Sequence, residues 1–193
     1  DFDRALELNP KNAIAYNARG TARRRGGDMD TAIRDYRLAI EFDPKFFLPY
    51  LNRGAAFFSK QNWGTALVDL RKCVELAPNH YLVQTLIWLV RVQLEDKATA
   101  DRELTNFVAR QKDPNGFVAI QARFLLRKSS ERDLLNAAKT PGEKSSAYYL
   151  LGEMRLLAGD RGTAKSYFEK CVANKHIASI EYDLAAKELS SMQ

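Results

Sequence analysis

The apolar and small residues of this chain recur at intervals of three and four, which is the spacing of one face of an α-helix. Residues 13–26 and residues 31–42 each carry such a stripe, and the sequence Gly26-Gly27-Asp28 breaks the first helix. Asp28 or Asp30 can cap the second helix by accepting a backbone N–H, and Pro44 can end it. The pattern therefore predicts a hairpin of two amphipathic helices.

The same pattern occurs again 34 residues later. The residues that match over this offset are Tyr16, Arg19, Gly20, Ala22, Ala32, Asp35, Arg37, Glu41 and Pro44, which recur as Tyr50, Arg53, Gly54, Ala56, Ala66, Asp69, Arg71, Glu75 and Pro78. So many matches at one offset identify a tandem repeat, which predicts stacked hairpins without a single central core. Because Gly20 and Gly54 are small, we expect the two helices of each hairpin to cross at close range.

The pattern weakens after the second unit and then returns. Residues 81–112 and 115–142 keep the helical spacing but lose most of the repeated residues, so we expect two degenerate repeats there. The second of these is short and follows the turn sequence Asp113–Gly116, which fits a hinge or a tight junction equally well. The residues that restore the spacing of the first unit are Tyr148, Gly152, Gly159, Ala164, Phe168 and Cys171.

The two ends of the chain extend this series. Residues 1–11 read as the second helix of a repeat whose first helix is missing, so we expect a fragment with any targeting segment upstream. Residues 177–193 predict a capping helix, because the last repeat of a stacked array otherwise exposes its packing face. Its apolar side comprises Ile177, Ile180, Leu184, Ala185 and Leu189, and its polar side Glu181, Asp183, Lys187 and Glu188. We expect one domain with complete units at 13–44, 47–78 and 145–176.

Each complete unit resembles the tetratricopeptide repeat, a helical hairpin of 34 residues. The residues that carry the resemblance are Tyr16, Gly20, Gly27, Ala32, Tyr36, Ala39 and Pro44 in the first unit and Tyr50, Gly54, Phe57, Ala66 and Pro78 in the second. Gln61 departs from the family, which often has glycine there. The resemblance implies an all-α right-handed superhelix and a non-catalytic adaptor that binds a protein or peptide. Residues 117–182 also resemble, less closely, the C-terminal part of bacterial periplasmic tetratricopeptide lipoproteins.

In this family the first helix of each unit lines a concave groove that holds a peptide. By register, the lining residues here would be Asn17, Thr21 and Arg24 in the first unit, Leu51, Asn52, Ala55 and Phe58 in the second, and Thr85, Leu89 and Val92 in the third. Such a groove is cationic near Arg24 and apolar from Phe58 to Val92, which implies a peptide with acidic and apolar residues. Packing of Leu89 and Val92 against the next repeat is an equally open alternative.

The net charge of +6 adds a second hypothesis, that the chain binds nucleic acid or another polyanion. Its support is the basic cluster from Arg19 to Arg25, because phosphate binding depends on several converging cations. Acidic residues are interleaved throughout, which favours a solvated basic face or a site for an anionic peptide over nucleic acid. A third hypothesis is a regulatory domain of a larger enzyme. Self-association also stays open.

No catalytic, metal-binding or cofactor-binding motif is recognisable in the sequence. His80 and His176 are single residues with no second ligand at metal spacing, and no Cys-x-x-Cys, phosphate loop or nucleophile elbow occurs. We therefore expect no enzyme activity and no cofactor. Cys73 and Cys171 share the buried register of Ala39, which predicts packed core thiols and no disulfide.

The sequence says little about the cellular compartment. The longest apolar run, Leu86 to Val90, is far too short to span a bilayer. Because any targeting segment would lie upstream of residue 1, both the bacterial cytoplasm and the periplasm remain open.

One pair of opposite charges recurs in the first two complete units. Arg19 and Arg53 stand where the family usually has a buried leucine, and the opposing helices carry Asp35 and Asp69. We predict that each arginine pairs with the aspartate of its own hairpin, within about 4 Å. Independent solvated charges are the alternative.

Overall fold

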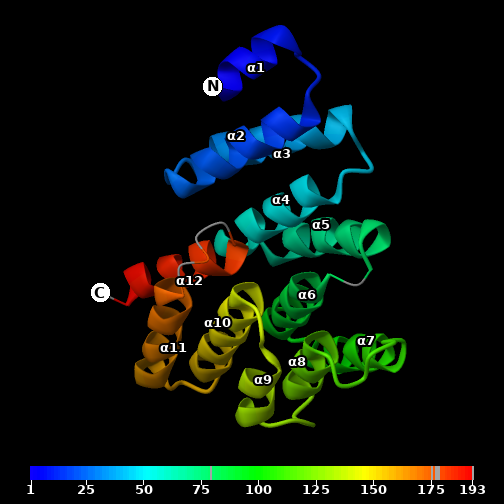
Figure 1. Cartoon of the computed structure of the whole chain (residues 1–193), viewed down its shortest axis with the longest axis vertical. Helices are drawn as coiled ribbons and strands as arrows, with labels where there is room; N and C mark the ends of the chain where they lie inside the picture. The colour runs from blue at the N-terminus through cyan, green and yellow to red at the C-terminus, as the bar shows by residue number, and fades with distance from the viewer. Residues whose placement is uncertain (79, 175, 177–178, 193) are drawn as a thin grey trace. The chain divides into compact units, whose positions relative to one another are not determined.

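A computed structural model describes the whole chain except residues 79, 175, 177–178 and 193. The part of the chain that it describes forms twelve α-helices and no strand (Figure 1). The helices are α1 (Phe2–Leu8), α2 (Ala13–Arg25), α3 (Met29–Phe42), α4 (Phe47–Ser59), α5 (Trp63–Leu76), α6 (Tyr81–Gln93), α7 (Lys97–Ala109), α8 (Phe117–Leu125), α9 (Glu131–Ala137), α10 (Pro141–Leu157), α11 (Arg161–Ala173) and α12 (Ile180–Ser191).

Two compact units divide the chain, residues 1–95 and residues 96–193. The boundary falls between α6 and α7, inside the expected third repeat at residues 81–112. Each unit has its own set of packed helices. The expectation of one continuous domain, and that of a hinge at residues 115–142, stay predictions.

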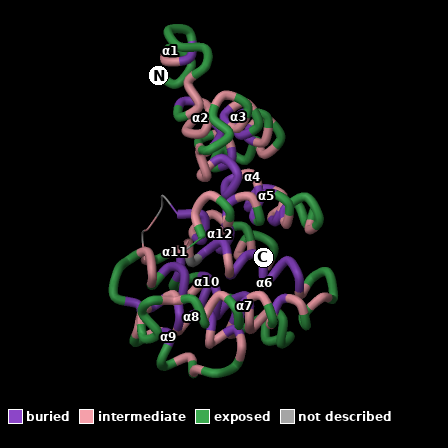
Figure 2. Tube along the Cα trace, turned by 90° about the vertical axis from the view of Figure 1, so that its right-hand side faces the viewer, coloured by how far each residue is buried: buried purple, intermediate pink, exposed green. Residues whose placement is uncertain are grey.

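In the first unit, α2 pairs with α3 and α4 pairs with α5 as helical hairpins. One hairpin stacks on the next through α3 and α4, and α6 follows on α5. The first helices α2, α4 and α6 also contact one another in series, so they form one layer. Buried and exposed positions alternate along the turns of these amphipathic helices (Figure 2).

The turn inside each hairpin depends on one residue in the left-handed region. Gly27 has a φ of 87° and Gly159 a φ of 79°, and Gln61 takes the same place in the second hairpin with a φ of 57°. The next residue then starts the second helix, since the Asp28 side chain accepts a hydrogen bond from the Thr31 N–H. The predicted break at Gly26–Asp28 is therefore confirmed, and of the two expected capping residues, Asp28 and Asp30, Asp28 is the cap.

Close crossing of the paired helices is also confirmed. A Cβ added to Gly20 would lie 2.8 Å from the Tyr36 ring, and one added to Gly152 would lie 2.4 Å from the Phe168 ring. Real Cβ atoms essentially never approach another atom so closely. Gly20 and Gly152 thus make room for an aromatic ring of the opposite helix, whereas a Cβ added to Gly54 would lie 3.2 Å from the Leu70 side chain.

In the second unit, α10 and α11 form the complete hairpin that the returning pattern predicts. Before it, α7 packs on α8, α8 on α9 and α9 on α10. The short helix α9 begins with a capping box, in which Ser130 and Asp133 exchange hydrogen bonds between side chain and backbone. Ser130 is therefore the N-cap of α9.

Helix α12 covers both α10 and α11 within the second unit. Ile180, Leu184 and Ala185 are buried as predicted, whereas Ile177 lies outside the described residues. The placement of Glu181 on the polar side was wrong, because its side chain is 2% exposed. Glu181 precedes Ala185 by four residues and therefore lies on the same helical face, which makes the buried stripe wider than the apolar residues alone suggest.

Candidate functional site

One face of α2 carries Ile14, Asn17 and Thr21 at intervals of three and four. The helix starts here because the Asn12 side chain accepts a hydrogen bond from the Ala15 N–H. Ile14 is 70% exposed, and the two polar residues are partly exposed. This face therefore combines an accessible aliphatic side chain with groups that can form hydrogen bonds.

The polar residues of this face are held in place by short contacts. Asn52 of α4 donates a hydrogen bond from Nδ2 to Oδ1 of Asn17, at 2.9 Å. The Thr21 hydroxyl donates to the Asn17 carbonyl at 3.0 Å and accepts from the Tyr36 hydroxyl at 3.5 Å. The structure thus brings three of the expected groove residues together, across the first helices of two neighbouring repeats.

Most of the other expected groove residues are buried. The buried ones are Arg24, Leu51, Asn52, Ala55, Phe58, Thr85 and Leu89. Phe58 packs edge-on against the Trp63 ring of α5 at 5.2 Å, and Arg24 lies 3.4 Å from the Tyr36 hydroxyl. Only Asn17, Thr21 and Val92 keep partial exposure among the ten. The accessible part of the expected groove is therefore concentrated on α2.

Ile14 was missed by the sequence reasoning, although a signal for it exists. The same register holds Leu48 and Leu82 at successive intervals of 34 residues, so an apolar side chain recurs there. Leu48 is half-buried and Leu82 is 2% exposed. The apolar residue at this register is therefore exposed on α2 and buried on α6. The spacing of residues in the sequence cannot reveal that difference.

The basic cluster on α2 is largely engaged inside the protein. Arg19 holds Asp35 in a two-pronged ion pair at 3.0 and 2.7 Å and also contacts Asp3 at 2.5 Å. Arg23 also donates to Oδ2 of Asp35, the oxygen that accepts from Nε of Arg19, at 2.8 Å. Because these arginines bind acids of their own unit, the whole cluster is not available to bind one external anion.

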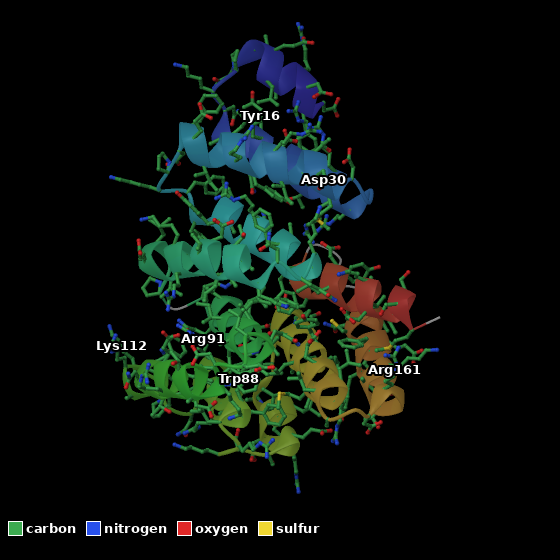
Figure 3. All side chains as sticks on the ribbon, turned by 180° about the vertical axis from the view of Figure 1, so that it is seen from behind. Tyr16, Asp30, Trp88, Arg91, Lys112 and Arg161 are labelled. Atoms are coloured by element: carbon green, nitrogen blue, oxygen red, sulfur yellow. The ribbon has the colours of Figure 1, made fainter. Side chains whose placement is uncertain are left out.

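Both predicted Arg–Asp pairs are confirmed. In the second hairpin, Arg53 contacts both oxygens of Asp69, at 2.8 and 2.7 Å. Asp35 and Asp69 are 1% and 3% exposed, whereas the arginines reach the surface. Tyr16, labelled on α2 in Figure 3, stacks on Phe42 at 5.5 Å and lies under the Arg19 guanidinium at 5.3 Å. The two arginines therefore link the first helix of their hairpins to the second.

The described residues offer little for catalysis or metal binding. No group of three histidine, cysteine or acidic side chains among them could hold a metal ion. Cys73 and Cys171 are free and buried, as predicted, and burial raises the pKa of each thiol to about 12. Such thiols are poor nucleophiles near neutral pH. Within the same residues, no helix has the length and apolar character to cross a membrane.

Comparison with protein families finds repeats at both ends of the chain. A family model described as "Tetratricopeptide repeat" matches residues 2–34, and one described as "TPR repeat" matches residues 20–61. A further "Tetratricopeptide repeat" model matches residues 145–175. These ranges include the first complete unit, the first helix of the second unit and almost all of the unit at 145–176. A search of curated proteins found no match.

Solved structures of similar fold cover nearly the whole chain. YrrB, described as a TPR protein with an unusual peptide-binding site, is 18% identical, with 94% of this chain and 95% of YrrB covered and a TM-score of 0.55. Pseudomonas aeruginosa pilF is 20% identical over 100% of this chain and 87% of its own, with a TM-score of 0.57.

A third similar structure is a tetratricopeptide repeat protein from Parabacteroides merdae. It is 16% identical over 97% of this chain and 75% of its own, with a TM-score of 0.59. At such identities the likeness concerns the fold alone. The all-α repeat architecture predicted from the sequence is confirmed, while the resemblance to periplasmic lipoproteins stays a prediction.

Proposed function

We propose that this chain, which is a tetratricopeptide repeat protein, is a non-catalytic scaffold that binds a peptide segment of a partner protein along the first-helix layer of its first unit. Proteins built from these repeats generally serve as scaffolds for protein interaction. The observation that carries the proposal is the exposed Ile14 beside the Asn17–Asn52 amide pair.

The chemistry of this face suits a short extended peptide. An exposed aliphatic side chain can gain free energy by burial against an apolar peptide residue, at roughly 25 cal/mol per Å² of apolar surface. The amides and the Thr21 hydroxyl can hydrogen-bond the peptide backbone and so position it. Apolar contact then supplies most of the binding affinity, and the polar groups fix the alignment of the peptide along the face.

The composition of the peptide follows from the same face and its surroundings. Ile14 favours an apolar residue, and the basic residues of α2 and α3 favour acidic neighbours. The peptide-binding site ascribed to YrrB supports a peptide as the kind of partner. The buried residues Leu51, Ala55 and Phe58 of α4 would support this face from beneath, while Val92 would extend it on α6.

A matched pair of substitutions tests the proposal. Ile14 on α2 and Val68 on α5 are aliphatic residues of similar exposure, 70% and 67%, on helices of the two different layers. Peptides would first be selected on the full chain from a random displayed library, and their affinities measured by calorimetry. We expect Ile14→Asp to weaken binding at least tenfold and Val68→Asp to leave it within about twofold, since only Ile14 belongs to the proposed face.

Two results would contradict the proposal. One is selected peptides that bind both variants as well as the parent chain, which would place the site elsewhere. The other is loss of binding only in Val68→Asp, which would place it on the second-helix layer. Circular dichroism of both variants would verify that each remains folded.

A further inference from the structure

We propose that α12 is a pH-dependent latch on the second unit, docked through two buried carboxyl groups, Glu153 of α10 and Glu181 of α12. Neither residue belongs to the proposed peptide-binding face. The inference starts from an unusual burial of acids, since glutamate is almost never fully buried unless it is paired.

The geometry places both acids where α12 docks. Helix α12 packs on α10 and α11 within the second unit. Glu153 is 7% exposed and Glu181 is 2% exposed. Among the residues that the structure describes, Oε1 of Glu181 is buried and has no hydrogen-bond partner. An ionised carboxylate in this position would lack most of the hydration that it has in water.

Neighbouring hydrogen bonds compensate a negative charge at Glu181 only in part, because the effect of burial is larger. Ser146 of α10 and Ser179 before α12 supply hydroxyls, and Asp183 on α12 adds a second acid. From α11, the Cys171 thiol contacts the Glu181 carbonyl oxygen at 3.7 Å.

Glu153 has a similarly acidic environment. Tyr149, one turn earlier on α10, places a neutral phenol near it, and α12 contributes Glu188 and Lys187. Lys187 favours the charged form of Glu153, whereas Glu188 opposes it. Protonation of Glu153 and Glu181 removes the cost of burying two charged carboxylates.

The expected titration follows from burial. Burial raises the pKa of Glu181 from 4.5 to about 7, and the Asp183 carboxylate adds to the shift. Burial likewise raises the pKa of Glu153 to about 7, with a contribution from Glu188. When α12 undocks and water reaches both groups, these pKa values return towards 4.5. The docked state therefore binds protons more tightly than the undocked state.

The sign of the pH dependence follows from this difference. Docking is strongest below about pH 4.5, weakens as pH rises from there to about 7, and changes little above it. Each carboxyl can change the docking equilibrium by up to about tenfold per pH unit in this window. Because α10 and α11 form a hairpin of their own, release of α12 would be a local event that leaves them folded.

The histidines would act differently. Burial lowers the pKa of His80 below 6.5, so protonation of His80 at acid pH opposes folding of the first unit. That dependence has the opposite sign and concerns another part of the chain. His176 lies between α11 and α12, and a His176→Gln variant is therefore a necessary control.

Amide hydrogen exchange of the full chain at pH 5.5 and pH 7.5 tests the latch. Rates would be expressed relative to an unstructured peptide at the same pH, which removes the intrinsic pH effect. We expect protection of the α12 amides to fall on the order of tenfold for each carboxyl between the two pH values, with little change in α11. The double variant with Glu153→Gln and Glu181→Gln should lose this dependence, whereas Glu169→Gln, an exposed glutamate of α11, should keep it.

Three outcomes would overturn the proposal. They are α12 protection that is equal at the two pH values in the parent chain, a pH effect that persists in the double variant, and an equal loss of protection in α11 and α12. If the double variant does not fold, each single variant should still remove about half of the effect on a logarithmic scale. Removal of the effect by His176→Gln would assign it to the histidine instead.

Discussion

At the scale of single residues, Asp35 shows how this chain departs from an apolar repeat core. Three arginine–carboxylate hydrogen bonds converge on its side chain, which is 1% exposed. Arg19 and Arg23 supply them from α2, so the charge is matched inside the hairpin. A buried ion pair with this geometry does not show greater stability than an apolar pair would give, but it penalises any packing that separates the charges. The recurring pair thus specifies how α2 meets α3.

The turn residue Gln61 offers a test at the same scale. A residue with a side chain at a φ of 57° is strained, and glycine is not. We expect Gln61→Gly to raise the free energy of unfolding by roughly 0.5–1 kcal/mol, measured by urea denaturation. The reciprocal change, Gly27→Ala, should lower it by about 1 kcal/mol, because a Cβ there meets no atom within 4 Å and only the backbone is strained. This explanation would be refuted if both substitutions changed the free energy of unfolding in the same direction and by the same amount.

At the scale of elements, the hairpin depends on how closely its two helices approach. Gly20 faces both the Tyr36 ring and the Ala32 carbonyl oxygen, which is 3.2 Å from the position of an added Cβ. The ring could turn aside, but the carbonyl belongs to the α3 backbone and cannot move without shifting the helix. The separation of α2 and α3 is therefore set by the absence of one side chain.

Two glycine substitutions in the first unit separate this packing effect from helix propensity. Gly20→Ala should lower the free energy of unfolding by roughly 1–3 kcal/mol, because it overpacks the crossing point. Gly64→Ala in α5, where an added Cβ meets nothing within 4 Å, should raise it by about 0.5 kcal/mol through the better helix propensity of alanine. Thermal and urea unfolding would measure both. Destabilisation of similar size at the two sites would mean that the crossing is not tight.

At the scale of the whole molecule, the net charge of +6 does not show which cations pair with acids of the same chain. Arg19, Arg23 and Arg53 are bound to aspartates of their own hairpins, and Lys60 pairs with Asp30 across neighbouring repeats at 2.6 Å. Much of the positive charge on these helices is therefore neutralised locally. The electrostatic field of the remaining positive charges suits the few acidic residues of a peptide better than the continuous charge of a polyanion.

Salt dependence distinguishes these two modes of binding. We expect peptides selected on the full chain to lose no more than about threefold in affinity between 50 and 200 mM NaCl, because apolar contact at Ile14 is insensitive to salt. A polyanion bound through the four arginines of the Arg19–Arg25 cluster would lose on the order of 10²-fold over the same range. A loss of that size for the selected peptides would favour the nucleic-acid or polyanion hypothesis. Titrations at three salt concentrations suffice.

The sequence alone determined the repeat, the helices and the internal contacts that recur with them. Asp28 and Gly27 act through the turn to which they belong, and Gly20 acts on the partner helix of its own hairpin, so these effects can be inferred from spacing. The Arg19–Asp35 pair could be predicted for a related reason, because both charges recur with the hairpin that brings them together. For these features, short-range geometry leaves few alternatives.

Only the tertiary structure decided which faces remain open to water. Ile14, Leu48 and Leu82 occupy one register but differ from 70% exposed to 2% exposed, and Glu181 is buried although its charge predicts exposure. Exposure depends on what else packs against a helix, and residues distant in sequence determine that packing. The position of a candidate binding face and the presence of buried acids under α12 are therefore properties of the folded chain, whereas the hairpin itself is a property of its repeat.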